Sequence, residues 1–533
     1  MPTDCISYQN SGYFSALMND YLDQKPNLDT LYNHFPTLGN FEKQIAEKQL
    51  NFNADGDGKR QTLVAALEKQ YSNLETSALT RQNIAALAAA NTFTVTTGHQ
   101  LNLFSGPLYF LYKIISTINL TTELKKKYPT SNFVPVYWMA TEDHDFEEIN
   151  YFNFKGKKFR WNKESSGPVG RLSTEGLDDF LAIFALEIGA GTNANAIKKL
   201  FEDSYLQHNT LADATRYLAN SLFGAYGLVI LDADNANLKR TFIPYIKEEL
   251  LQQSSYKAVM ETAEKLKDYT IQVNPREINL FYIEDTIRER IILENGIYKV
   301  NHTKITFTST EILALLENHP EKFSPNVIMR PLYQEVILPN LCYIGGGGEI
   351  AYWLELKSFF EKVNVTFPML LLRNSALLAT EKQAKKADQL HLSWNDLFAK
   401  QTDLVNRKTK ELSEFPIDLI HLKEQLRQQF ESLHAITNQT DKSFAGAVKA
   451  QETKQIKGLE NLEKRLLKAQ KRKLNDVLER ITDLQNELFP NTSLQERQAN
   501  FSEFYIENGP ALIPELIQQL HPLESNFKII TLP

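Results

Sequence analysis

Cysteine is scarce in this chain, which contains only Cys5 and Cys342 among 533 residues. Two cysteines provide neither a disulfide framework nor the spacing of a metal site, and sparse cysteine is typical of a reducing compartment. Cys342 lies within an apolar strand pattern. We therefore interpret it as a core residue rather than a nucleophile.

Long hydrophobic runs are also missing, because no apolar segment approaches the roughly 18 residues that a membrane helix needs. The first residues, MPTDCISYQN, lack the basic and apolar regions of a signal peptide. The net charge is −7 and the pI is about 5.9, so the composition has no general attraction for nucleic acid or an anionic membrane. These absences predict a cytoplasmic protein without nucleic-acid or membrane partners.

The residues that are present predict an α/β fold. Hydrophobic residues make up 42% of the chain, enough for a large core, and the length suggests roughly two to four domains. Strand patterns at 92–98 and 134–140 flank a long amphipathic helix. This βαβ unit favours a parallel sheet, with further strands predicted at 227–234, 340–344 and 366–373.

Changes in residue composition and in helix and strand patterns divide the chain into three parts. We predict a core over residues 1–378, with inserted segments at about 151–225 and 275–325, the second with antiparallel strands. Residues 379–490 are rich in Lys, Glu and Gln and predict a helical coiled-coil arm, and residues 491–533 are predicted to return to the core.

A coiled-coil seam is predicted near the end of the arm. Steps of three and four separate Leu474, Val477, Ile481, Leu484 and Leu488. This spacing indicates self-association through the arm. A helical hairpin that packs only on itself is the alternative.

Polar residues follow each predicted core strand, at the edge where open parallel sheets bind ligands. The strand at 134–140 is followed by Glu142, Asp143, His144 and Asp145. His144 is the natural proton acceptor, because histidine titrates near neutrality. The alternative is that Asp145 and Glu148 form a helix capping box, which would explain only part of the cluster.

A second candidate site begins at the TGHQ segment, where Gly98, His99 and Gln100 follow the strand at 92–98. The amides of the next helix could hold an anion, with Gly106 in the loop and Lys113 and His99 adding charge. An ordinary capped loop is the alternative. Past the strand at 366–373, Arg373 and Ser375 are predicted to contact phosphate.

The run GGGGEIAYW predicts a place where the backbone approaches a ligand closely, at Gly345 and Gly346. Glu349 would repel phosphate there and suits an ammonium or hydroxyl group. Arg330 offers a planar fork for a carboxylate, although a structural salt bridge is the alternative. The predicted substrate-binding residues also include two more side chains, Gln334 and Tyr352.

Metal binding is not predicted. His99, Glu142, His144 and Asp145 are suitable residue types, but their spacing matches no metal-binding motif.

The segments TGHQLNLFSGPLYFLYK, VPVYWMATEDHDFEEIN, MRPLYQEVILPN, YIGGGGEIAYW and LQERQANF resemble the BshC family, the cysteine-adding enzymes of bacillithiol biosynthesis. The resemblance implies a Rossmann-like core similar to nucleotidylyl transferases and class I aminoacyl-tRNA synthetases. It also implies connecting insertions, a coiled-coil arm and a homodimer formed through that arm. Two positions depart from the family pattern, His99 and Gly347.

The activity that the resemblance implies is the addition of cysteine to glucosaminyl-malate through an amide bond. Neither the HxGH nor the KMSKS signature is present, so ATP with Mg²⁺ is implied only by analogy. In this scheme the TGHQ loop, Lys113 and Arg373 stabilise phosphate, and Arg330 binds the malyl carboxylate. His144, oriented by Asp143 or Asp145, removes the proton of the attacking amine.

Two other functions remain open from the sequence alone. One is a metal-dependent amide hydrolase that uses the His, Asp and Glu cluster. The other is a non-catalytic coiled-coil protein that binds a metabolite.

Overall fold

The central element is a five-stranded parallel sheet. The computed structural model describes residues 4–53, 58–437, 439–440 and 442–532. The strand order is β13-β12-β2-β3-β6, and every neighbouring pair is parallel. The strands are β2 (Thr92–His99), β3 (Asn132–Met139), β6 (Val229–Asp232), β12 (Asn340–Gly345) and β13 (Met369–Leu372). The predicted α/β fold with a parallel sheet is therefore confirmed.

Hydrophobic burial explains why these segments form the sheet. All eight residues of β2, TFTVTTGH, are buried, and β-branched residues suit a pleated strand that is covered on both faces. Helix α6 (Tyr109–Lys127) joins β2 to β3 and packs Leu120 and Leu124 beside Phe93 and Val95. Cys342 belongs to this same cluster and is fully buried, as predicted.

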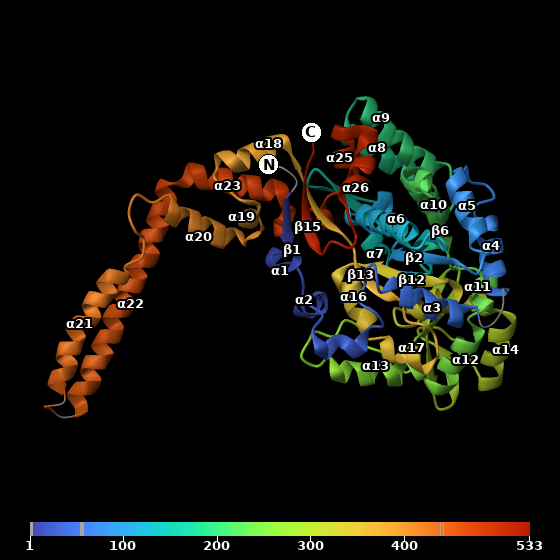
Figure 1. Ribbon diagram of the computed structural model, residues 1–533, viewed down its shortest axis with the longest axis horizontal. Coiled ribbons are helices and arrows are strands. Elements are labelled where there is room, and N and C mark those ends of the chain that lie inside the picture. Colours follow the sequence, from blue (N-terminus) through green and yellow to red (C-terminus); the bar gives the residue numbers. More distant parts are fainter. Residues whose placement is uncertain (1–3, 54–57, 438, 441, 533) are drawn as a thin grey trace.

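Helices cover the sheet on both sides. Figure 1 shows α6 and α10 (Leu211–Phe223) above it, and α12 (Ile243–Gln252), α13 (Ser254–Lys265) and α17 (Lys357–Lys362) below it. None of the helices in the described part of the chain has an apolar stretch that would span a bilayer.

Both predicted insertions contain antiparallel strands, which the sequence predicted for the second. The first begins with a hairpin, β4 (Tyr151–Phe154) and β5 (Lys157–Arg160). The second forms an antiparallel sheet in the order β10-β9-β8-β7-β11. Its strands, together called the inserted sheet below, are β7 (Leu280–Glu284), β8 (Ile287–Glu294), β9 (Ile297–Val300), β10 (Thr306–Phe307) and β11 (Phe323–Pro325).

A third sheet joins the two ends of the chain to the base of the arm. Strand β15 (Asn526–Leu532) pairs antiparallel with β1 (Asp4–Ser7) and parallel with β14 (Ser375–Thr380). Figure 1 shows the N and C ends beside this junction. The last segment of the chain thus returns to the base of the arm.

The arm projects away from the core (Figure 1). Its outer part is a hairpin of α21 (Ile420–Thr437) and α22 (Lys442–Lys473), and α22 ends just before Leu474. The predicted seam lies in the next helix, α23 (Asn475–Leu488), where Ile481 and Leu484 are fully buried. Helix α23 packs against α18 (Glu381–Gln389) and α20 (Gln401–Glu411) at the base of the arm. The seam is therefore covered within the chain, because any neighbouring helix can satisfy a spacing of three and four.

A buried ion pair fastens α3 (Phe41–Phe52) to α15 (Met329–Ile337). Lys48 Nζ lies 2.9 Å from Glu335 Oε2, and the two side chains are 1% and 0% exposed. Glu335 Oε1 also accepts hydrogen bonds from Gln334 and Asn340. The carboxylate is therefore satisfied only while all of its partners are present.

Replacing Lys48 with methionine is expected to lower the free energy of unfolding by about 3–5 kcal/mol, because the Glu335 carboxylate would remain buried without a counter-charge. Urea unfolding measures the change. The double variant Lys48→Met/Glu335→Leu is the control and should recover part of the loss. A decrease below about 1 kcal/mol in the single variant would show that the pair does not hold the fold.

Candidate active site

A cavity of about 1540 Å³ opens at the carboxyl ends of the parallel strands. Strand ends of the central sheet form one wall, and residues of the inserted sheet, including Phe281 and Arg288, form another. Most of the predicted site residues line this one cavity. They are Gly98, His99, Gln100, Lys113, Glu142, Asp143, His144, Asp145, Arg330, Gly346, Glu349, Tyr352 and Arg373.

Four predicted residues, Gly106, Gln334, Gly345 and Ser375, lie outside the cavity lining. Ser375 is buried, and its hydroxyl contacts Arg373 and Glu496. Gln334 Nε2 donates a hydrogen bond to Glu335. The amide oxygen of Gln334, Oε1, then accepts from Arg330 Nη1 at 3.2 Å. Gln334 thus contacts Arg330 from behind the cavity lining.

His99 does not supply the predicted positive charge. It is 7% exposed, and burial, with Lys113 and Arg373 nearby, lowers its pKa well below the usual value. The ring is therefore neutral at pH 7, and its Nε2 has no hydrogen-bond partner among the described residues. Gln100 donates to Asp143 and Glu148, so its amide group is already engaged by carboxylates.

The predicted phosphate site has little charge to offer. At the start of α6, Pro107 has no N–H and Leu108 N donates to Ala499 O. Lys113 Nζ donates to Gly98 O at 2.7 Å and pairs with Glu349 at 2.5 Å. Arg373 pairs with Glu496 at 2.7 Å. Both cations of the prediction are therefore neutralised by carboxylates of the protein itself.

Glu349 is held as an ionised carboxylate at the start of α16 (Gly347–Leu354). It accepts hydrogen bonds from Gly346 N at 2.8 Å and Tyr343 OH at 2.7 Å, in addition to the pair with Lys113. Burial alone would raise its pKa, but these partners lower it overall. An incoming ammonium group would therefore share Glu349 with Lys113.

Arg330 differs from these paired cations. Its guanidinium donates to Gln334 and to Tyr352 OH at 3.0 Å, and it faces the Tyr343 ring at 5.7 Å. Within the described ranges no carboxylate lies at ion-pair distance from it. The salt-bridge alternative does not fit this geometry, and Arg330 presents an uncompensated charge to the cavity.

Other arginines of the cavity also lack an ion-pair partner among the described residues. Arg288 and Arg290 of the inserted sheet and Arg276 just before it line the cavity. Arg497, near the C-terminal end of the chain, lines it as well. No carboxylate of the described residues forms an ion pair with any of them. These arginines can therefore contact negative charges of a ligand, beside the carboxylates of Asp143, Asp145 and Glu148 that line the same cavity.

The orientation of His144 comes from Arg288 rather than from an aspartate. Arg288 Nη1 lies 2.6 Å from His144 Nδ1, whereas Asp143 and Asp145 lie 3.8 and 3.9 Å from the ring nitrogens. Because arginine only donates, Nδ1 accepts and a neutral His144 carries its proton on Nε2. The predicted aspartate partners are thus replaced by an arginine of the inserted sheet.

The capping-box alternative is wrong, since Asp145 makes no side-chain bond at the start of α7 (Phe146–Ile149). Ligand atoms of Asp143, His144 and Asp145 lie within 4.8 Å of one another. However, Asp143 already accepts from Gln100 and from His144 N, and Arg288 occupies His144 Nδ1. An adjacent guanidinium and occupied oxygens do not suit a cation, so we assign no metal here.

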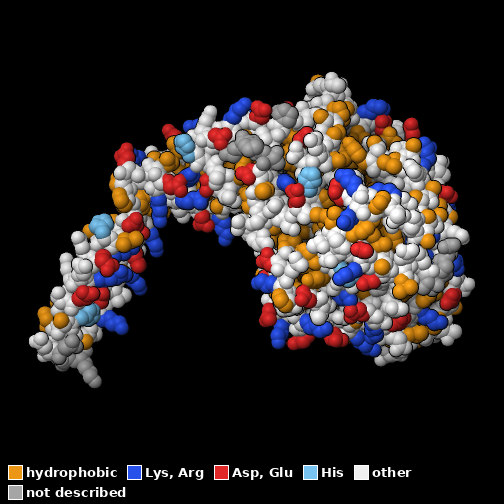
Figure 2. Space-filling view, viewed as in Figure 1, with side chains coloured by type: hydrophobic (Ala, Val, Ile, Leu, Met, Phe, Trp, Pro, Cys, Tyr) orange, Lys and Arg blue, Asp and Glu red, His pale blue; other side chains and the backbone are white. Residues whose placement is uncertain are grey.

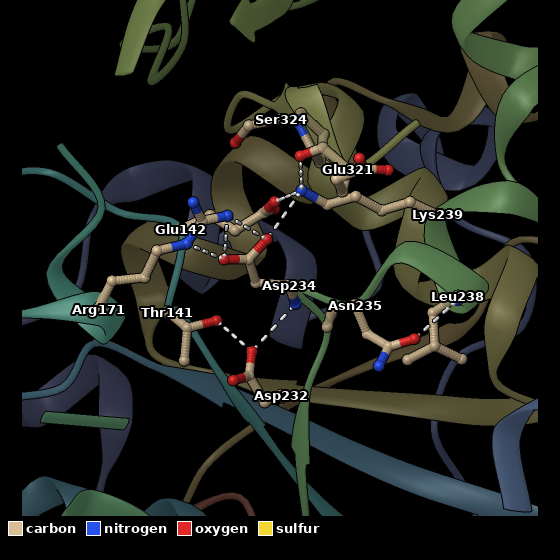
Figure 3. Close-up of polar contacts among 12 residues, drawn as sticks. Thr141, Glu142, Arg171, Asp232, Asp234, Asn235, Leu238, Lys239, Glu321 and Ser324 are labelled. Carbon is tan, nitrogen blue, oxygen red and sulfur yellow. Dashed lines mark hydrogen bonds and ion pairs between the residues drawn. The ribbon is translucent and has the colours of Figure 1, made fainter. Parts of the chain in front are cut away.

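Glu142 belongs to a buried network that the sequence did not reveal. Figure 3 shows it beside Lys239, with Asp234 and Arg171 close by. Glu142 forms an ion pair with Lys239, and burial raises the pKa of Glu142 to about 7 against the effect of that lysine. Asp234 lies two residues past the end of β6, within the strand predicted at 227–234. No motif or residue spacing in the sequence indicated that Lys239 or Arg288 belongs to the site.

An open parallel sheet with a cavity beyond its strand ends, an inserted sheet and a helical arm define a Rossmann-like α/β protein with a coiled-coil arm. The chain belongs to the BshC family. The N-terminal Rossmann-like domain of bacillithiol biosynthesis BshC matches residues 1–374, and the C-terminal coiled-coil domain of BshC matches residues 376–532.

Relatives match along the whole chain, and each is named "Putative cysteine ligase BshC". The protein of Flavobacterium johnsoniae is 74% identical, with 100% of both chains covered. That of Flavobacterium psychrophilum is 65% identical over 99% of both, and that of Cytophaga hutchinsonii is 37% identical over 98% of both. These names support neither the hydrolase nor the non-catalytic alternative.

Among solved structures, methionyl-tRNA synthetase of Mycobacterium tuberculosis with methionyl-adenylate aligns with 81% of this chain and 92% of that chain. The identity is 11% and the TM-score is 0.22, which is too low to support a shared fold.

Proposed function

We propose that this protein is the cysteine ligase of bacillithiol biosynthesis and joins L-cysteine to glucosaminyl-malate through an amide bond. The observation that carries the proposal is the pairing of two chemistries in one cavity. Arg330 offers an uncompensated cation, while Glu142 and His144 offer acid–base groups at the same sheet edge. We place the reaction in the cytoplasm as a prediction from the sequence.

The anionic substrate is assigned to the arginines. Arg330 can bind the malyl carboxylate with its planar fork, beside Tyr352 and the backbone of Gly346. Glu349 faces the same space and can accept from an ammonium group or a sugar hydroxyl. Buried His99 Nε2 and Arg373 Nε have no partner among the described residues. Ligand contacts would offset the desolvation of those two atoms, which costs about 1–3 kcal/mol each.

Amide formation from a free carboxylate requires activation of that carboxylate, and we propose ATP with Mg²⁺ as the activator. Lys113 and Arg373 are neutralised by Glu349 and Glu496. The cations left for phosphate groups are therefore on the cavity wall, at Arg276, Arg290 and Arg497. When bound, ATP supplies a good leaving group on the carboxyl carbon.

The test is mass spectrometry of products after incubation of purified full-length protein with cysteine and glucosaminyl-malate, with and without ATP and Mg²⁺. Bacillithiol formed only with ATP, together with AMP or ADP, is the expected result. Folded protein that makes no bacillithiol under either condition would contradict a ligase that acts alone.

We also propose that two copies of the chain associate through the arm. Figure 2 shows charges of both signs along the arm with hydrophobic atoms between them. Ile420, Ile436 and Leu462 are 64%, 49% and 54% exposed on the hairpin of α21 and α22. A second copy would cover these side chains.

Changing Ile436 and Leu462 together to lysine is expected to convert the dimer to a monomer, because charges would replace apolar contacts at the interface. Light scattering coupled to gel filtration measures the mass. Leu186→Lys is the matched control, since Leu186 is 85% exposed on the core helix α8 (Leu177–Ile188). A wild-type monomer, or a variant that stays dimeric, would contradict the proposal.

A further inference from the structure

Lys239, which no motif singled out, lies between two carboxylates behind the cavity wall. It belongs to α11 (Ala236–Arg240) and its side chain is 1% exposed. Its Nζ pairs with Glu142, lies 3.1 Å from Asp234 Oδ1 and donates to Glu321 O (Figure 3). Glu142 lines the cavity and Lys239 does not. The lysine can therefore act on a ligand only through Glu142.

The network connects the end of the central sheet with the inserted sheet. Asp234 also binds Arg171 at 2.8 Å, and Arg171 in turn reaches Asp285 at 2.9 Å, between β7 and β8. Burying a lysine is costly unless it is paired, so the two carboxylates hold Lys239 in place. The Glu142 carboxylate is thereby fixed at the end of β3.

Three other acid–base groups of the cavity are already engaged, whereas the Asp145 carboxylate is 55% exposed. His144 Nδ1 faces Arg288, so a neutral His144 has no lone pair directed at the cavity. Asp143 accepts from Gln100 and from the His144 amide. Glu349 accepts from Lys113, Tyr343 and Gly346, and its pKa is lowered, which makes it a weak base.

We propose that Glu142 accepts the proton from the attacking amine, and that Lys239 is the positioning residue that keeps the Glu142 carboxylate ionised. The proposal rests on the proposed ligase function. The amine nitrogen forms a bond to the activated carboxyl carbon, the bond to the phosphate-containing leaving group breaks with its electron pair, and the nitrogen's proton passes to Glu142. His144 then serves as a donor through Nε2–H rather than as the base.

The charges around Glu142 determine its pKa, and with it the pH at which activity should rise. Burial and Asp234 raise the pKa of Glu142, whereas Lys239 and Arg288 lower it, with about 7 as the result. The groups that face it from the packed elements are Lys239 of α11, Asp234 after β6, Arg288 of β8 and Tyr333 of α15. A base must be ionised, so activity is expected to rise with pH through the pKa of Glu142.

Two substitutions should therefore move this rise in opposite directions. Lys239→Met removes the favourable cation and should shift the rise of kcat/KM upward by about one pH unit or more. Asp234→Asn removes a negative charge and should shift it downward. Lys239→Arg, which keeps the charge, should leave it near the wild-type position. If Lys239 and Asp234 only stabilised the fold, both Lys239→Met and Asp234→Asn would lower activity, but the pH at which kcat/KM rises would not move in opposite directions.

Infrared difference titration of the carboxyl band, assigned with Glu142→Gln, provides a readout that needs no turnover. The expected result is the same order of midpoints, with Lys239→Met highest and Asp234→Asn lowest. Unchanged midpoints in folded variants would overturn the role of Lys239. Shifted midpoints with a pH profile that does not follow them would overturn Glu142 as the proton acceptor. Absence of product from wild-type protein would count against the ligase function instead, while the titration still tests the network.

Discussion

Replacing Arg330 with glutamine is expected to raise the KM for glucosaminyl-malate about 100-fold, with a smaller change in kcat. Arg330 has no carboxylate partner within the described ranges, and Gln334 and Tyr352 hold its guanidinium toward the cavity. Removing it deletes a preorganised charge-assisted contact to the malyl carboxylate. Initial rates at varied substrate concentration measure the effect.

Three comparisons make this prediction specific. Arg330→Lys should recover little, because an ammonium group cannot reproduce the planar fork. Arg81→Gln, on the exposed side of α5 (Ala78–Ala86), is the matched control and should behave as wild type. The KM for cysteine should change much less than that for glucosaminyl-malate. Equal increases for both substrates would instead indicate general damage to the cavity.

Replacing His144 with alanine is expected to lower turnover about 100-fold or more, because a positioned acid–base group contributes on that scale. Arg288 holds the ring so that a neutral His144 directs Nε2–H to the cavity. Steady-state turnover at saturating substrates measures the loss.

His421→Ala is the control for this substitution, since His421 is exposed on the arm helix α21. A loss below about threefold in folded His144→Ala protein would remove His144 from the mechanism. Restoration of activity by His144→Gln, which keeps an N–H donor, would support the donor role over the role of base.

The parallel sheet and the edge that carries the site were predictable because both depend on local patterns. Runs such as TFTVTTGH and FVPVYWM are apolar and β-branched enough to be buried on both faces. Polar residues placed directly after such runs must emerge at one edge, where the chain leaves the core. The position of Glu142–Asp145 beside the cavity follows from this rule.

The electrostatics of the site were not predictable, since they depend on partners far apart in sequence. Lys113 is neutralised by Glu349 and Arg373 by Glu496, at separations that no local pattern can encode. His99 lost its charge through burial beside those cations. The phosphate site predicted from residue types therefore lacks the free charge that it was expected to have.

The inserted sheet and the arm illustrate a second limit. The sequence pattern predicted their strands and helices, but it did not predict which elements those strands and helices pack against. Arg288 of β8 reaches His144, which follows β3 in the chain, and the seam of α23 is covered by α18 and α20. A repeating apolar pattern shows that a face is buried and leaves the identity of its partner open.

The most direct test of the central claim is a crystal structure of the full-length protein with glucosaminyl-malate bound. We expect density in the strand-end cavity, with the malyl carboxylate hydrogen-bonded to Arg330 and the glucosamine nitrogen beside Glu142. Density for the ligand elsewhere on the chain, with this cavity empty at saturating concentration, would contradict the assignment of the cavity as the active site.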